Sequence, residues 1–239
     1  MSSGQLPLWS PKANLSRFEN FEVFAGSSNF ALLQSLQNYI RIPETTPFYI
    51  HGEVGSGKTH LLHSAAHLIR ELGEQSVIYC DCKSANISPA MLLSDFGTAN
   101  NTTNFLLDNI DCWSQNNQGE QSLFSIVEQA KNGHFRLILT AQQSPQNSQF
   151  NLADLISRLN SGVVFQLEPL NDEGKIMALQ KNIQARNLPI DTKVLQYLLT
   201  HFARDNHSLF LALDKLDRAS MIEQRKLTIP FVQQVLARS

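Results

Sequence analysis

The sequence predicts an α/β fold in which a five-stranded parallel sheet wrapped by helices is followed by a small all-helical domain. Short apolar segments rich in strand formers alternate with helical patterns up to residue 168, and only helical patterns follow from residue 169. Between the first predicted strand and the next helix lies a segment with the spacing of a phosphate-binding loop. We therefore expect an N-terminal peptide over 1–14, a nucleotide-binding α/β core over 15–168 and a helical domain over 169–239.

Composition and charge exclude several classes of protein. The 239 residues include 42% hydrophobic residues and have a formal net charge of -2, with neither a basic tail nor an acidic run, so bulk charge gives no support to sequence-specific DNA binding. The three cysteines, Cys80, Cys82 and Cys112, have no repeated spacing and predict neither a disulfide framework nor a zinc site. No signal peptide or membrane-length apolar run is present, and we expect a cytoplasmic protein without a membrane partner.

The first 14 residues predict a linear docking peptide. Gln5, Leu6, Leu8 and Trp9 form a tight, largely apolar cluster in a polar stretch that precedes every predicted core element. An extended peptide of this kind inserts large apolar side chains into the pockets of a partner and becomes ordered as it binds. The alternative is that Trp9 packs back onto its own domain.

Five apolar segments predict the strands of the sheet, because each is rich in strand formers and bounded by turn or helix-start residues. They are residues 47–51, 76–80, 105–111, 135–140 and 163–167. The helices predicted around them cover residues 32–40, 61–69, 88–93, 121–131 and 152–159. Strands that are apolar on both faces are typical of a parallel sheet buried between two helical layers.

The phosphate-binding loop covers residues 52–59 and fits the pattern G-x-x-x-x-G-K-[ST] at every fixed position. A buried strand precedes it and a helix follows, so its backbone N–H groups and the helix N-terminus can face phosphate groups. Lys58 can reach the β- and γ-phosphates, and the Thr59 hydroxyl can bind Mg²⁺. The residues expected at the nucleotide are Gly52, Val54, Gly55, Ser56, Gly57, Lys58, Thr59 and His60. An accidental match in a loop without a nucleotide is the alternative.

Carboxylates end the strand predicted at 105–111. Asp108 is expected beside the phosphate loop, because the carboxyl ends of parallel strands form the crevice where such sheets bind ligands. There it can hold Mg²⁺ directly or through water, together with Thr59. The next strand ends at Thr140, which is expected at the nucleotide, and in the polar residues after it, because polar residues in this position can sense a γ-phosphate.

Helical patterns alone follow Pro169. They cover residues 172–186, 191–201, 208–222 and 230–236, and good helix-start residues precede or open several of them. The three histidines of the loop helix, at 60, 63 and 67, share one helix face, but no nearby ligand set favours a metal site over a partly exposed face. We therefore expect a small helical domain and no zinc.

Several short strings carry a resemblance to a known family. They are FENF at 18–21, G-x-SN at 26–29, DNI at 108–110, DRAS at 217–220 and RKLTIPF at 225–231. With these strings and the phosphate loop, the chain resembles the AAA+ ATPases over nearly its whole length, and within them the DnaA branch and its Hda-like regulators, in which the DNA-binding domain of DnaA is missing. The resemblance implies that Phe21 lies at the nucleotide and that the helical domain is a lid.

The resemblance also implies partners. In this family a peptide like Gln5 to Trp9 docks on the DNA sliding clamp, and the nucleotide-bound protein then stimulates hydrolysis of ATP on the DnaA initiator, which inhibits re-initiation. Arg158 is similar in position to the family's arginine finger, which acts in trans on the nucleotide of the partner and contributes about 10³- to 10⁵-fold in rate. The alternative is a surface arginine paired with Asp154 one helical turn back. A homo-oligomer through AAA+ or N-terminal peptide contacts is a further alternative.

Two departures from the family pattern favour nucleotide binding over ATP hydrolysis. Related ATPases carry an acidic residue after the Walker B aspartate, where this chain has Asn109, and an amide cannot accept the proton of the attacking water. His207 stands where the family's lid carries a sensor arginine. ADP or another nucleoside diphosphate with Mg²⁺ is therefore the expected ligand, with ATP possible. The alternative is a helicase-loader type motor that hydrolyses its own ATP, with Asp111 as a substitute base.

Overall fold

A computed structural model describes residues 29–42, 44–73, 76–84, 102–171, 190–202 and 206–237, with isolated positions between 173 and 183. Within these ranges one parallel sheet has the strand order β2-β3-β4-β1-β5. Its strands are β1 (Phe48–His51), β2 (Ser76–Asp81), β3 (Thr103–Asp108), β4 (Arg136–Ala141) and β5 (Val163–Gln166). The predicted five-stranded parallel sheet is confirmed.

The third strand is shorter at its C-terminal end than predicted. β3 ends at Asp108, and Ile110–Trp113 forms a short 3-10 helix, η3, so the prediction of a strand up to residue 111 is wrong. The reason lies at Asn109, whose left-handed backbone (φ 60°, ψ 47°) cannot continue an extended strand. Asp108 is thereby the last strand residue, and Asp111 lies in the 3-10 turn.

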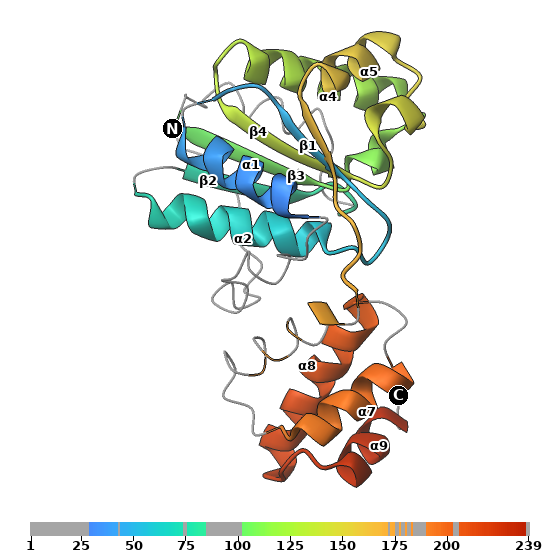
Figure 1. Ribbon diagram of the computed structural model, residues 1–239. Coiled ribbons are helices and arrows are strands. Elements are labelled where there is room, and N and C mark those ends of the chain that lie inside the picture. The colour runs from blue at the N-terminus through green and yellow to red at the C-terminus, as the bar shows by residue number, and fades with distance from the viewer. Residues whose placement is uncertain are drawn as a thin grey trace, which may run out of the picture.

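Helices cover both faces of the sheet (Figure 1). The first face packs against α1 (Phe30–Arg41) and α2 (Lys58–Glu71), and the second packs against α4 (Asn117–Lys131) and α5 (Ala153–Asn160). Strand residues alternate between the two cores: Phe48 and Ile50 contribute to the first, and Tyr49 to the second. This alternation explains why the strand segments read as continuously apolar.

Helix α4 begins four residues earlier than the predicted start at 121. The Asn116 side chain accepts a hydrogen bond from the Gly119 N–H (3.2 Å), which satisfies a backbone donor that the helix leaves open. Glu120 is buried, with 2% exposure, and its carboxylate accepts bonds from loop N–H groups. The helix predicted at 88–93 lies outside the described residues.

The C-terminal helices form a separate body below the α/β core in Figure 1. They are α7 (Thr192–Phe202), α8 (Asn206–Glu223) and α9 (Ile229–Ala237), close to the predicted 191–201, 208–222 and 230–236. Leu198, Leu213 and Phe231 belong to a buried cluster of their own. The helix predicted at 172–186 lies largely outside the described residues. No helix in the described ranges has the length and apolar character needed to cross a membrane.

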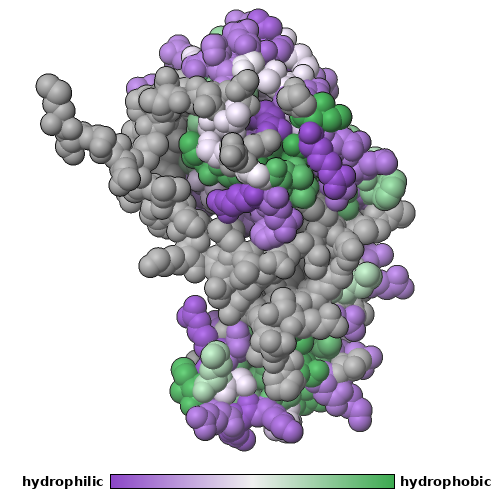
Figure 2. Space-filling model, turned by 90° about the vertical axis from the view of Figure 1, so that its left-hand side faces the viewer, coloured by the Kyte–Doolittle hydropathy of each residue, from purple (hydrophilic) through white to green (hydrophobic). Residues whose placement is uncertain are grey.

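The described surface is largely polar on the face shown in Figure 2. Hydrophilic residues cover most of it on both bodies, and the hydrophobic residues among them form small groups. Large apolar side chains that are more than half exposed include Phe30, Val54, Met221 and Ile222, which lie on α1, the phosphate loop and α8. They are scattered over different elements, as is normal for globular proteins.

Asn29 ties the start of α1 to the segment that leaves the sheet. Its side chain, 1% exposed, donates to the Glu168 carbonyl oxygen (3.1 Å) and accepts from the Glu168 N–H (2.9 Å). An amide side chain can satisfy both groups of one peptide residue in this way, where a strand neighbour would otherwise do so. The pair fixes the chain next to the start of the helical domain.

Replacing Asn29 by alanine is expected to lower the free energy of unfolding by about 1–3 kcal/mol, because two buried backbone groups lose their partner. Urea unfolding of the purified protein measures this loss. Asn38→Ala, at an exposed position of α1, is the matched control and is expected to cost much less. Equal stability of the two variants would contradict the structural role of Asn29.

Candidate nucleotide-binding site

The predicted phosphate loop leaves β1 at His51 and enters α2 at Lys58, at the C-terminal edge of the sheet. Gly55 and Gly57 have φ angles of 81° and 103°, which glycine adopts without the steric cost of a Cβ atom. Val54 is 77% exposed, whereas Ser56 is fully buried. The backbone thus turns sharply before the helix, as a loop that presents N–H groups to an anion requires.

Gly52 is required for a different reason. A Cβ atom at this position would lie 2.5 Å from the Leu167 carbonyl oxygen and 2.9 Å from Ser56 Oγ. Leu167 also donates its N–H to the His51 carbonyl oxygen (2.6 Å). The first loop residue therefore packs directly against the backbone that leaves β5.

Lys58 is 7% exposed and points back into the loop. Its Nζ donates to the carbonyl oxygens of Gly52 (2.6 Å) and Glu53 (2.8 Å). Burial lowers the pKa of Lys58, while the charges of Asp108 and Asp111 act in the opposite direction. A cation in this position is ready to bind phosphate oxygens that approach the loop.

The Asp108 carboxylate joins four elements. Oδ2 accepts hydrogen bonds from Thr59 Oγ1 (2.6 Å) and from the Tyr79 hydroxyl (3.1 Å), and Oδ1 accepts one from Thr140 Oγ1. Asp108 is only 1% exposed, so these hydroxyl groups replace the water that a carboxylate otherwise needs. The structure thus brings together the two predicted Mg²⁺ ligands, Thr59 and Asp108.

Sequence reasoning missed Tyr79 and its contact with Asp108. Thr140, which the sequence predicts at the nucleotide, is fully buried, and its hydroxyl donates to Asp108. Tyr79 lies on β2, and burial, with the nearby Asp108 charge, raises the pKa of its hydroxyl far above the usual range. Its position in the apolar strand 76–80 gave one signal, because a tyrosine buried there needs a hydrogen-bond partner.

The side-chain amide of Asn109 acts as a hydrogen-bond donor. Its Nδ2 donates to Asp81 Oδ1 (3.0 Å), and its backbone N–H donates to Thr140 Oγ1 (3.0 Å). Asp111 Oδ1 is buried and accepts no hydrogen bond within the described part of the chain. Asp111 therefore offers a buried acceptor that is not used within the described residues.

The histidines of α2 lie beside this centre. Desolvation lowers the pKa of His60 to about 4, with a smaller contribution in the same direction from His63. The His63 ring lies 4.5 Å from the Tyr79 ring, between centroids, and burial lowers its pKa too. Near neutral pH both rings are uncharged, so neither adds a positive charge for phosphate.

The residues present fit a Mg²⁺-nucleotide. The buried Ser56 Oγ has no hydrogen-bond partner within the described ranges and lies in the loop where phosphate would bind. No group of three or more His, Cys, Asp and Glu in the described residues is placed to hold a metal ion. Mg²⁺ would therefore rest on Thr59 and Asp108 together with phosphate oxygens, its usual mode beside nucleotides.

Several predicted site residues lie beyond what the structure describes. Phe21 and the docking residues Gln5, Leu6, Leu8 and Trp9 fall outside the described residues. His207 is the second residue of α8, but its side chain also falls outside them.

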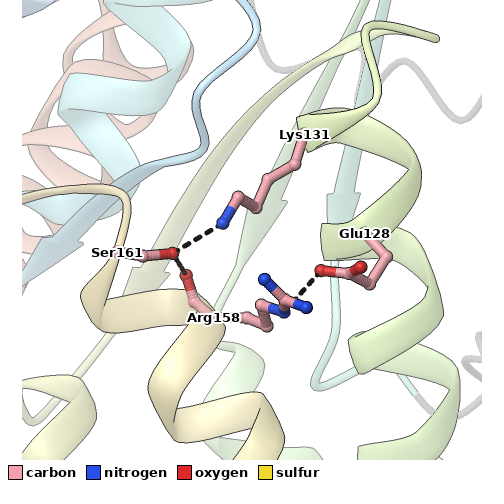
Figure 3. A network of polar contacts seen from close by, with 4 residues as sticks. All are labelled: Glu128, Lys131, Arg158 and Ser161. Atoms are coloured by element: carbon pink, nitrogen blue, oxygen red, sulfur yellow. Dashed lines mark hydrogen bonds and ion pairs between the residues drawn. The ribbon is translucent and has the colours of Figure 1, made fainter.

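Arg158 lies on α5, on the face of the sheet opposite α2. Its Nε contacts Glu128 Oε1 of α4 at 2.8 Å, and its side chain is 45% exposed. Figure 3 shows this pair beside Lys131 and Ser161. The sequence suggested Asp154 of the same helix as the alternative partner, and this is wrong, because the ion pair is made with the neighbouring helix.

Comparison with solved structures defines the fold. Domain III of the Thermotoga maritima replication initiation protein DnaA has a TM-score of 0.78 at 20% identity, over 93% of this chain and 96% of that one. AMPPCP-bound DnaA from Aquifex aeolicus has a TM-score of 0.63 at 20% identity, over 83% and 64%. The Thermotoga maritima RuvB Holliday junction branch migration motor has a TM-score of 0.69 at 14% identity, over 93% and 72%. The fold is that of an AAA+ protein.

Family models match most of the sequence. The model of the bacterial DnaA ATPase domain matches residues 14–166, and that of the Hda lid domain matches residues 172–236. The chain therefore belongs to the DnaA/Hda family of AAA+ proteins.

Replacing Lys58 by alanine is expected to weaken binding of ADP and of ATP by about 10- to 100-fold, because a charge-assisted contact to phosphate is lost. Titration with a fluorescent nucleotide measures the dissociation constant. Lys193→Ala, at an exposed position of α7, is the matched control and should leave it unchanged. A Lys58 variant with wild-type affinity would rule out this loop as the phosphate site.

Proposed function

We propose that this protein is a nucleotide-bound negative regulator of replication initiation that stimulates hydrolysis of the ATP held by the DnaA initiator. The observation that carries the proposal is the half-exposed Arg158 guanidinium, on the sheet face opposite the helix that begins at the phosphate loop. An arginine displayed away from its own nucleotide fits the nucleotide of a partner, where it would stabilise the charge that develops during phosphoryl transfer.

The nucleotide of this chain is proposed to be ADP or another diphosphate, with Mg²⁺ on Thr59 and Asp108. The amide of Asn109 supports this, because the side chain beside Asp108 cannot accept the proton of an attacking water, and its Nδ2 is engaged as a donor to Asp81. A resident diphosphate would keep the core in one state while Arg158 acts on the partner.

The docking peptide Gln5, Leu6, Leu8 and Trp9 is proposed to bind the DNA sliding clamp. Its support is the order of residue types in the sequence, a glutamine followed by apolar and aromatic residues. Docking on a clamp would concentrate the protein where initiation has just occurred, which raises its effective concentration for the initiator.

A second function has one specific observation in its favour. A helicase-loader type motor that hydrolyses its own ATP needs a base near Asp108, and Asp111 has a buried oxygen with no hydrogen-bond partner in the described residues. The charge of Asp111 also acts on Lys58, so the carboxylate lies near the loop.

Replacing Arg158 by alanine is expected to lower the stimulated rate of DnaA-bound ATP hydrolysis by about 10³-fold or more, because the charge of the transition state loses its counter-charge. The assay combines the protein, clamp-loaded DNA and ATP-bound initiator, and follows the initiator's ATP. The control is Arg218→Ala, at an exposed arginine of α8. The double variant Leu8→Ala, Trp9→Ala tests the clamp peptide in the same assay. Full activity of both the Arg158 and the peptide variants would end the assignment.

Turnover of ATP by the protein alone is expected to be slow and insensitive to Asp111→Asn. Multiple-turnover assays without clamp or initiator measure it. Fast hydrolysis that Asp111→Asn abolishes would instead establish the motor function, with Asp111 as base.

A further inference from the structure

We propose that Glu128 of α4 is a positioning residue for Arg158, and that it sets the direction in which the guanidinium faces a partner; the inference rests on the proposed function. The contact joins Arg158 Nε to Glu128 Oε1 at 2.8 Å, between two helices (Figure 3). The pair is partly shielded, since the side chains are 45% and 29% exposed.

The guanidinium atom that makes the ion pair decides which nitrogen atoms stay available to a partner. An arginine has one Nε and two Nη atoms, and the two Nη atoms form the fork that binds phosphate or carboxylate oxygens in pairs. Within the described residues the side chain of Arg158 contacts Glu128 through Nε. Glu128 therefore occupies the side of the guanidinium that a phosphate does not need, and the fork stays available.

The backbone of Arg158 is also fastened to α4. Ser161 Oγ donates to the Arg158 carbonyl oxygen (2.7 Å) and accepts from Lys131 Nζ (2.8 Å), as Figure 3 shows. Lys131 ends α4, so a second contact from the same helix reaches the last turn of α5. The side chain of Arg158 thus contacts α4 directly, and its main chain is linked to α4 through Ser161.

The other end of α5 is fixed by the same helix. The buried Glu120 carboxylate accepts from the N–H groups of Asn151 (2.8 Å) and Leu152 (2.7 Å), just before α5 begins. A helix held at both ends loses little further freedom when a partner arrives. The geometry therefore matches a preformed group for charge stabilisation, which need not reorganise during the reaction.

The alternative is that the Glu128 carboxylate inhibits Arg158. In that arrangement the carboxylate would bind the Nη fork and compete with phosphate, and its removal would raise activity. The contact through Nε favours positioning. Glu128 Oε1 accepts no hydrogen bond within the described residues, so its contact with Arg158 is an ion pair, and the negative charge of Glu128 holds the guanidinium.

The test measures the rate constant for initiator-bound ATP hydrolysis as the concentration of this protein rises. Glu128→Ala is expected to lower the maximal rate by about 10- to 100-fold, as displacement of a catalytic group does, with the half-saturating concentration unchanged. Glu128→Gln is expected to lower the maximal rate as well, because the amide keeps the shape of the side chain and loses the charge that makes the ion pair. In an Arg158→Ala background, Glu128→Ala should cost nothing further, since it acts through Arg158. Gln121→Ala, exposed on the same helix, is the matched control.

Three outcomes overturn the inference while Arg158→Ala still abolishes stimulation: an unchanged rate in Glu128→Ala, a raised rate, or a loss that adds to that of Arg158→Ala. If Arg158→Ala itself retains full stimulation, the proposed function fails and the inference falls with it. Thermal unfolding checks that each variant is folded, and Glu128→Met, which keeps the apolar stem, takes the place of an unstable Glu128→Ala.

Discussion

The constraint on which the rest of this structure depends is the need to satisfy one buried carboxylate. Asp108 ends β3 in an environment with almost no water, and its oxygens accept hydroxyl groups from Thr59, Tyr79 and Thr140. These donors come from α2, β2 and β4, so the charge can stay buried only if the sheet order and the loop helix are all in place. Because an unsatisfied buried carboxylate is very costly, fold and site stabilise each other.

The sheet separates the phosphate loop from Arg158. On one face, α2 begins at the phosphate loop, and on the other, α4 and α5 carry Glu128 and Arg158. Strand residues alternate between the faces, so each strand contributes to both cores. A parallel sheet of this kind is a rigid spacer, and it keeps Arg158 away from the phosphate loop of its own chain.

Much of the core was predictable because its signals are local. The loop motif, the strand segments and most helices follow from spacing and apolar pattern. The end of β3 was not predictable in this way. The backbone of Asn109 is left-handed, and Asn109 donates hydrogen bonds to the side chains of Asp81 and Thr140, which are distant in sequence. The partner of Arg158 was not predictable either. The i, i+4 rule compares residues of one helix, whereas Glu128 lies on the neighbouring helix α4. The docking peptide and the lid position His207 stay predictions.

Gly52 shows how one residue can answer to two requirements. The motif assigns it to phosphate binding, yet a side chain there would collide first with the Leu167 carbonyl group, on the path toward the helical domain. An alanine at position 52 would thus push apart two backbone segments, and its phenotype would mix mispacking with altered ligand affinity. Such a variant is a poor tool for silencing the nucleotide site, and its defects would say more about the joint between the two bodies than about chemistry. Genetic screens that score loop glycines as one functional class would merge two unrelated defects.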